Sequence, residues 1–182
     1  MDNGVGDGPL KFAIGESIVH PYRNAAFEDL PEIVAIYNAT IASRQVTADL
    51  EPVSVDSRID WFHAHAPDSY PLWVVEADNG GIGGWLSFSP FHSRAAYRHT
   101  AEISIYIRAD QRRRGLGGFL LREAMRRAPG LGFEVLIGLI FGHNQPSLDL
   151  FAAANFEQWG LLPEVTRLDG RARDVIIVGR RV

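Results

Sequence analysis

The chain contains no cysteine and only one lysine, Lys11, among its 182 residues. The lack of cysteine excludes disulfides, thiolate metal ligands and a cysteine nucleophile. A phosphate loop of the Gly-Lys-Ser/Thr type is also excluded, because Lys11 does not stand in such a sequence. No apolar run approaches the roughly 20 residues of a membrane span, and the first residues lack the basic start and apolar core of a signal peptide. We therefore expect a cytoplasmic protein that does not bind membranes.

Positive charge is concentrated in one part of the sequence. The formal net charge is −4, so a general affinity for nucleic acid is not expected. Seven of the seventeen arginines nevertheless lie between residues 108 and 127, which predicts a local anionic ligand. A hydrophobic content of 46% is typical of a globular protein. We expect one domain over residues 17–182, preceded by a loose tail at residues 1–16.

Residues 102–128 predict a strand, a tight loop and a helix. Apolar and polar residues alternate over 102–107, and one face carries Glu102, Ser104 and Tyr106. From Leu116 onward the apolar residues recur at helical spacing, and Pro129-Gly130 ends the pattern. The helix must therefore begin inside the segment that is rich in arginine and glycine.

That segment has the features of a pyrophosphate site. It runs Arg112, Arg113, Arg114, Gly115, Leu116, Gly117 and Gly118. The first turn of a helix presents unpaired N–H groups and the positive end of the helix dipole. Glycines let the backbone approach phosphate oxygens, and the arginines add charge. The alternative is an ordinary turn with a solvated basic loop. A dinucleotide fingerprint fails, because Leu120 stands where the third glycine or alanine is needed.

The run from Arg112 to Gly117 matches the pattern Gln/Arg-x-x-Gly-x-Gly/Ala. In this the chain resembles the GNAT superfamily of N-acetyltransferases, and within it the phosphinothricin and methionine sulfoximine acetyltransferases. The similarity extends over about residues 20–182 and includes the segments 23–38 and 89–107. It implies the GNAT fold, an α+β arrangement in which a mixed, mostly antiparallel sheet splays between strands 102–107 and 135–140. It also implies acetyl-CoA as the co-substrate, no metal, and a homodimer.

The resemblance also implies where acetyl-CoA is held. The pantetheine arm would enter the gap between the two splayed strands, and the pyrophosphate would lie on residues 112–118. Backbone N–H groups of Ile105, Tyr106 and Ile107 would orient the thioester. The segment from Asn144 to Ser147 matches the family's Asn-x-x-Ser, so the Asn144 amide would contact the CoA arm with Ser147 nearby.

The amine substrate needs a base and, for an amino acid, an anchor for its carboxylate. Glu102 lies on the central strand, where partial burial would raise its pKa toward that of a useful base, and a carboxylate here matches the resembling enzymes. The alternative is a structural carboxylate paired with Arg98 or His99. By its position in the resembling enzymes, Arg94, with Tyr97 nearby, is the candidate for binding the substrate carboxylate, and solvated loop residues are the alternative.

This assignment leaves the proton donor for the leaving thiolate open. Many GNAT enzymes carry a tyrosine at the position of Phe151, which has no proton to give. Water, Tyr106 or His143 could take its place. His63 and His65 stand two residues apart, so they cannot share a helical face and are a poor metal pair.

Other segments complete the expected domain. We expect a strand at 18–24, helices at 30–42 and 54–65, and strands at 72–78 and 82–89 joined by Asn79-Gly80-Gly81. A buried strand at 135–141, a helix from Pro146 to Asn155, and a hairpin of 156–168 and 173–180 follow. The resulting hypothesis is acetyl transfer to the α-amino group of a small amino acid or analogue. The alternatives are a GNAT that acetylates protein or peptide amines and a non-catalytic acyl-CoA sensor.

Overall fold

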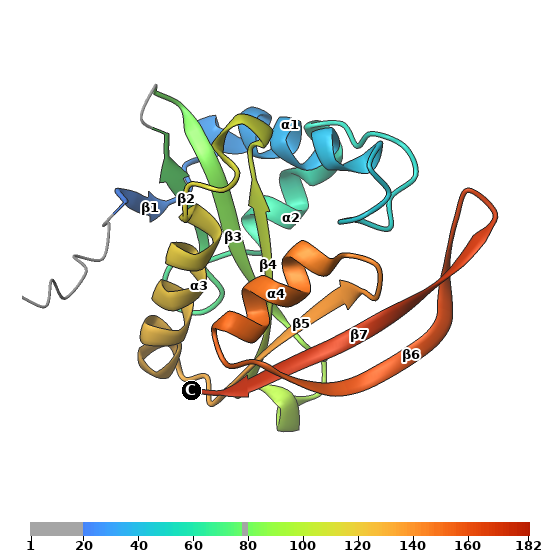
Figure 1. The fold of residues 1–182 in the computed structure, drawn as a ribbon. Helices are drawn as coiled ribbons and strands as arrows, with labels where there is room; N and C mark the ends of the chain where they lie inside the picture. The colour runs from blue at the N-terminus through green and yellow to red at the C-terminus, as the bar shows by residue number, and fades with distance from the viewer. Residues whose placement is uncertain (1–19, 78–79) are drawn as a thin grey trace, which may run out of the picture.

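A seven-stranded mixed sheet organises the protein, and α helices pack on both of its faces (Figure 1). The computed structural model describes residues 20–77 and 80–182. The strands within these ranges are β1 (Tyr22–Asn24), β2 (Leu72–Glu76), β3 (Ile82–Pro90), β4 (Thr100–Ile107), β5 (Val135–Phe141), β6 (Glu157–Leu168) and β7 (Arg171–Arg181). The helices are α1 (Leu30–Ile41), α2 (Ile59–His63), α3 (Leu116–Arg127) and α4 (Gln145–Ala153). In space the strands follow the order β1-β2-β3-β4-β5-β7-β6.

The two faces of the sheet bury different clusters of apolar side chains. On one face, α3 and α4 cover a large core that includes Phe88, Ile103, Leu120, Leu136 and Phe151. On the other face, α1 and α2 cover a smaller cluster that includes Ile33, Val74 and Trp85. Because neighbouring residues of a strand point to opposite faces, the alternation in β4 sends its isoleucines to the first core and leaves Glu102, Ser104 and Tyr106 on the second face.

β4 and β5 separate after a short parallel pairing. The partners run from Thr100 with Val135 to Glu102 with Ile137, and no pairing follows among the described residues. Every other strand pair of the described chain is antiparallel. The predicted GNAT fold, with its splayed, mostly antiparallel sheet, is thereby confirmed. The splay leaves backbone groups of β4 without a neighbouring strand, which is how the fold makes room for a ligand.

Most predicted elements are present with shifted ends. The expected helix 54–65 is a 3-10 turn at Asp56–Arg58 followed by the short α2, and the side chain of Ser54 accepts a hydrogen bond from the Ser57 N–H at 3.1 Å. The hairpin of β6 and β7 turns at Asp169-Gly170 as predicted, and Asn155 takes the left-handed conformation that ends α4 (φ 56°). The predicted tail, the first residues of the strand 18–24, and Asn79 in the turn between β2 and β3 lie outside the described residues. Within the described ranges, none of the helices has the length and apolar character that crossing a membrane requires.

Candidate functional site

A cavity of about 190 Å³ lies over β3 and β4 on the face covered by α1 and α2. Its floor carries the hydroxyls of Ser87, Ser89 and Ser104. Its walls are largely aromatic, and they include Tyr37, Trp61, Trp85 and Tyr106 together with the guanidinium of Arg58. A small cavity with apolar walls and a few polar groups is the usual form of a site for a small molecule.

A second hollow fills the gap where β4 and β5 separate. Its lining comes from four segments and consists of Val46, Ile103, Ser104, Ile105, Tyr106, Gly138, Leu139, Ile140, Asn144, Ser147 and Phe151. Ser104 and Tyr106 line both hollows. The two spaces therefore meet at these two residues, and a group bound in the gap lies next to a group bound in the cavity.

The backbone of β4 offers hydrogen-bond donors to the gap. Arg108 donates its N–H to the Gly83 carbonyl of β3 at 2.9 Å, and the His99 carbonyl accepts from Val135 N–H at 3.1 Å on the β5 side. Backbone groups alternate in direction along a strand, so the N–H groups of Ile105 and Ile107 point to the β5 side while that of Tyr106 points to β3. Of the three amides predicted to orient a thioester, two thus face the gap.

Glu102 lies just beyond the serine end of the cavity floor and is not itself one of the residues that line the cavity. It stands opposite Ser89 in the antiparallel register, on the same face as Ser104. The side chain is half-buried, and burial raises the pKa of its carboxyl above the ordinary value of 4.5. Within the described chain it forms no ion pair with Arg98 or His99, and the His99 ring lies instead 3.1 Å from the Gly132 carbonyl oxygen. A half-buried carboxyl with a raised pKa can accept a proton from an amine.

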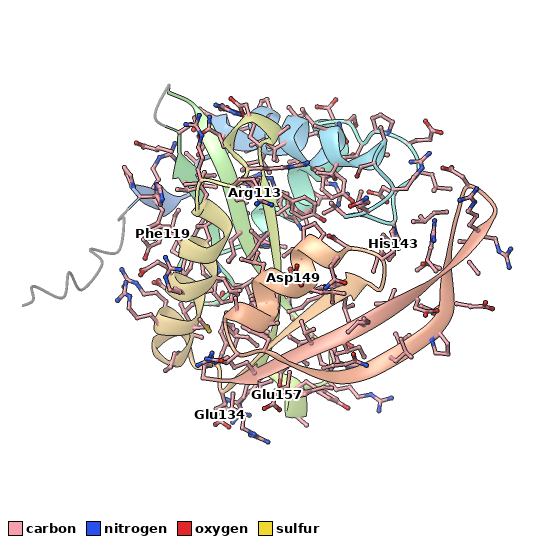
Figure 2. The ribbon with its side chains drawn as sticks, viewed as in Figure 1. Arg113, Phe119, Glu134, His143, Asp149 and Glu157 are labelled. Carbon is pink, nitrogen blue, oxygen red and sulfur yellow. The ribbon has the colours of Figure 1, made fainter. Side chains whose placement is uncertain are left out.

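The basic loop precedes the N-terminus of α3, as the sequence predicts. Figure 2 shows Arg113 beside the start of this helix. The first intrahelical hydrogen bond runs from Phe119 N–H to the Gly115 carbonyl at 2.9 Å, so the amides of Leu116, Gly117 and Gly118 precede it and are available to an anion. Arg112 and Arg113 are exposed, and together with the helix dipole they make this end of α3 electropositive.

Gly115 and Gly117 of this loop are each required for a different structural reason. Gly115 has a φ of +85°, a left-handed conformation that a side chain would strain. A Cβ on Gly117 would lie 3.3 Å from Cδ2 of Leu150, so this glycine lets α3 pack closely against α4. Close approach of a phosphate to residues 112–118 stays a prediction, and the packing reason is one that the sequence motif did not reveal.

Asn144 and Ser147 line the gap at the start of α4. The Asn144 side chain is buried and its Oδ1 accepts the Ser147 N–H at 3.2 Å, which caps the helix. Its Nδ2 has no hydrogen-bond partner among the described residues, so this N–H₂ can donate to a ligand in the gap. The cap fixes the direction of that donor.

The groups considered as proton donors lie in different surroundings. Phe151 is buried against Gly138 and Phe156. The His143 ring nitrogen Nε2 lies 2.8 Å from the Arg44 carbonyl oxygen, and Figure 2 shows His143 away from α3. Tyr106 lines both hollows, and its burial raises the pKa of the hydroxyl strongly, so the hydroxyl remains protonated.

Arg94 and Tyr97 lie on the loop between β3 and β4, outside the residues that line the cavity. Tyr97 is 42% exposed and packs against Phe91 and His92. Arg94 is exposed, and its backbone N–H donates to the ring of His92. The structure does not bring these two side chains to Ser104, where the hollows meet.

Sequence reasoning predicted Tyr106 as a site residue but missed Arg58, Trp61 and Trp85. Arg58 stands three residues before Trp61, a spacing that puts both on one side of a helical turn. This spacing is the feature of the sequence that could have indicated that Arg58 and Trp61 lie together. Trp85 and Ser87 come from a separate strand, and only the fold shows that they share a cavity with α2.

The loop of residues 42–55 covers both hollows. Val46 lines the gap and Val53 lines the cavity. The loop is held at both ends. Arg44 forms an ion pair with Asp169 at 3.0 Å, and Asn38 makes two hydrogen bonds to the backbone of Val53, at 2.9 and 3.0 Å. A segment tied to both α1 and the β6–β7 turn thus forms part of the wall of each hollow.

Comparison with known proteins agrees with this geometry. Residues 33–156 match the acetyltransferase (GNAT) family. The chain is 50% identical over 160 residues to the Bacillus subtilis protein named "Putative phosphinothricin acetyltransferase YwnH", with 88% of this chain and 98% of that protein covered. It is 35% identical over 153 residues to an L-methionine sulfoximine/L-methionine sulfone acetyltransferase of Pseudomonas paraeruginosa, with 84% and 89% covered.

Solved structures show the same fold. A phosphinothricin acetyltransferase of Sinorhizobium meliloti in complex with AcCoA superposes with a TM-score of 0.85 at 30% identity, and the match covers 91% of this chain and 89% of that one. The family match spans both hollows, from α1 to the end of α4, and therefore includes the strand, loop and helix on which the prediction was based. The chain belongs to the acetyltransferase (GNAT) family.

Proposed function

We propose that the protein transfers an acetyl group from acetyl-CoA to the α-amino group of a small amino acid or analogue. The observation that carries the proposal is the meeting of the two hollows at Ser104 and Tyr106. One hollow has the size and lining of a small-molecule site. The other is open along the unpaired edge of β4, between two helix N-termini. The names of relatives that act on phosphinothricin and methionine sulfone support a substrate of this class.

The residues of the gap fit acetyl-CoA. The amides at the start of α3, with Arg112 and Arg113, would bind the pyrophosphate. Asn144 would donate from its Nδ2 to the pantetheine arm, with Ser147 beside it. Acetyl-CoA, when bound, supplies the acyl group as a thioester. The N–H of Ile105 points into the gap at the level of Ser104, where it would hydrogen-bond the acyl carbonyl oxygen and stabilise negative charge on it.

Glu102 is the proposed general base. The amine must lose a proton before its nitrogen can attack the acyl carbon, and the Glu102 carboxylate would take that proton through one water. The N–C bond then forms, the nitrogen loses its second proton to water, the C–S bond breaks, and the thiolate leaves with the electron pair of that bond. Tyr106, protonated and beside the gap, is the proposed donor of the proton that the thiolate takes up. Arg94 and Tyr97 remain candidates for contact with the outer part of the substrate.

The test is release of free CoA from acetyl-CoA across a panel of amines. The panel contains phosphinothricin, methionine sulfoximine, methionine sulfone, ordinary amino acids and several peptides. We expect turnover confined to the small amino acids and analogues. Turnover with peptides alone would instead show a protein acetyltransferase, and binding of acetyl-CoA with no release for any amine would favour a sensor.

The cellular setting and the assembly belong to the same proposal. We propose that the enzyme works in the cytoplasm, where acetyl-CoA and free amino acids occur, and that it forms a homodimer. Sedimentation equilibrium of the purified protein would test the dimer, and a monomer at micromolar concentration would contradict it.

A further inference from the structure

Arg58 places a positive charge in the wall of the cavity over β3 and β4. Its guanidinium carbon lies 5.0 Å from the centre of the Tyr37 ring and 6.0 Å from that of Trp61. Both rings line the same cavity. The side chain of Arg58 is 29% exposed, so water still reaches it. The guanidinium is therefore held against two aromatic faces and open on the side of the cavity.

Most of the donors of Arg58 are unused. Nη2 donates to Oδ2 of Asp49 at 3.0 Å, and this is its one hydrogen bond within the described chain. A guanidinium carries five N–H donors in a planar fork, so a pair of parallel N–H groups is left for a second anion. Asp49 also accepts from the Tyr37 hydroxyl at 2.6 Å. The contacts of Arg58 fix its orientation before a ligand arrives, which reduces the entropy lost on binding.

The ionisable groups differ along the floor of the cavity. Arg58 and its partner Asp49 lie near the aromatic end. Glu102 lies beyond the other end, opposite Ser89 in the register, and is not itself a lining residue. The serines lie between them. An α-amino acid carries an anion and a cation on one carbon atom, so a guanidinium with free donors at one end and a carboxylate beyond the other orient such a molecule in one direction.

We propose that Arg58 binds the α-carboxylate of the substrate through two N–H groups, and that Asp49 and Tyr37 position it for this. The inference rests on the proposed function and adds the residue that makes the site specific for amino acids. Held by Arg58, the carboxylate places the adjacent amine near Ser104, where the gap opens. Simple amines without a carboxylate enter the same cavity but are not oriented.

The experiment compares substrates that differ only in the carboxylate. kcat/KM is measured with L-methionine sulfone, its α-carboxamide and 3-(methylsulfonyl)propylamine, in the wild type and in Arg58→Gln, Arg58→Lys, Asp49→Asn and Arg171→Gln. In the wild type we expect the carboxylate to be preferred over the carboxamide by roughly 10- to 100-fold, the range for a charged hydrogen-bonded pair. Arg58→Gln should lower that preference to about 1, mainly through the KM of the carboxylate substrate. Arg58→Lys should keep part of it, because lysine holds the charge without the fork.

Two variants separate binding from a structural role. Asp49→Asn removes the charge that holds the guanidinium but keeps a side-chain oxygen that can accept from Nη2, so the preference should fall less than in Arg58→Gln. Arg171, an exposed arginine at the start of β7, serves as the matched control, and its replacement should change nothing. Circular dichroism and thermal unfolding establish that each variant is folded. If Arg58→Gln does not fold, the comparison of Arg58→Lys with Asp49→Asn decides in its place.

Three results would overturn the inference. The first is an unchanged preference in Arg58→Gln or Arg58→Lys. The second is an equal loss in Asp49→Asn, which would mean that Arg58 only holds the loop of residues 42–55. The third comes from Arg94→Gln, measured with the same three substrates: loss of the preference in this variant with the preference kept in Arg58→Gln. Absence of acetyl transfer from the wild type to every amine would instead contradict the proposed function, and that outcome is distinguishable because it does not depend on any variant.

Discussion

Tyr106 of β4 stacks on Trp85 of β3, with ring centres 4.3 Å apart and planes inclined by 21°. The two residues are direct partners in the antiparallel register. The ring centre of Tyr37, which belongs to α1, lies 5.1 Å from that of Tyr106. These ring contacts hold the side chain of Tyr106, a residue that lines both the cavity and the gap, in one orientation.

Replacing Tyr106 by phenylalanine tests the hydroxyl without removing the stack. The hydroxyl is protonated and so has a proton to donate to the thiolate, although burial raises its pKa and thereby makes it a weaker acid. We expect Tyr106→Phe to lower kcat by about 10²-fold, the lower end of the range for general acid catalysis, with little change in thermal stability. The measurement is steady-state kinetics over pH. An unchanged kcat would assign the proton to water.

Replacing Glu102 by glutamine tests the base. We expect turnover to fall by about 10²-fold while the Kd for acetyl-CoA, measured by calorimetry, stays the same. The wild type should lose kcat/KM on the acid side as Glu102 becomes protonated, at a pH above 4.5 because burial raises the pKa. Glu157→Gln, a change at an exposed glutamate of β6, is the control and should leave both quantities unaltered. Full turnover in Glu102→Gln would remove this residue from the mechanism.

The same residue should affect stability in a pH-dependent way. A carboxyl whose pKa is raised by folding binds its proton more tightly in the folded state. Its contribution to stability is complete below the unfolded pKa and is lost as pH rises through the folded pKa. Glutamine cannot ionise, so the stability of Glu102→Gln relative to the wild type should increase between about pH 4 and about pH 8. Urea unfolding at both pH values measures the difference, and a constant difference would refute the burial of the charge.

Charge reversal at Arg113 tests the phosphate site. We expect Arg113→Glu to raise the KM for acetyl-CoA at least roughly tenfold at low salt, because it exchanges an attraction for a repulsion at the start of α3. The effect should shrink at high salt, since the side chain is exposed. kcat at saturating acetyl-CoA should change little. Arg127→Glu, at the far end of the same helix, provides the comparison. Equal KM values for the two variants would argue against a phosphate at this loop.

Gly84 in β3 tests the packing beneath the site. A Cβ there would lie 2.6 Å from Cδ1 of Ile107 and 2.7 Å from the Tyr106 carbonyl oxygen. Because one of these atoms is backbone, the strand itself must shift. We expect Gly84→Ala to reduce the free energy of unfolding by about 1–3 kcal/mol and to lower activity as β4 moves. A Cβ added at Gly130 would have no heavy atom of the described chain within 4 Å other than those of its chain neighbours. The free energy of unfolding of Gly130→Ala should therefore stay within about 0.5 kcal/mol of that of the wild type.

The sequence contained enough to predict the fold and the central motif. The alternation in 102–107 and the helical spacing after Leu116 are local patterns, and local patterns determine β4 and α3 directly. The ends of α2 were less predictable. The expected helix was several residues longer than the observed Ile59–His63, because the 3-10 turn before it has nearly the same side-chain spacing.

The walls of the cavity were not predictable from one sequence. Arg94 was predicted because arginine binds carboxylates and because of its position in the resembling enzymes, yet whether a loop side chain turns inward depends on packing that no local pattern encodes. Arg58 enters the cavity because Tyr37, Asp49 and Trp61 hold it there. These residues come from α1, the following loop and α2, so their meeting is a property of the tertiary structure.

The short pairing of β4 with β5 has a kinetic consequence. With the sheet open beyond Glu102, the protein has two entrances to one reaction centre, one from the side of α1 and α2 and one along the parted strands. Neither substrate has to pass the other on its way in. We therefore predict that acetyl-CoA and the amine bind in either order, which initial-rate kinetics with both substrates varied would test.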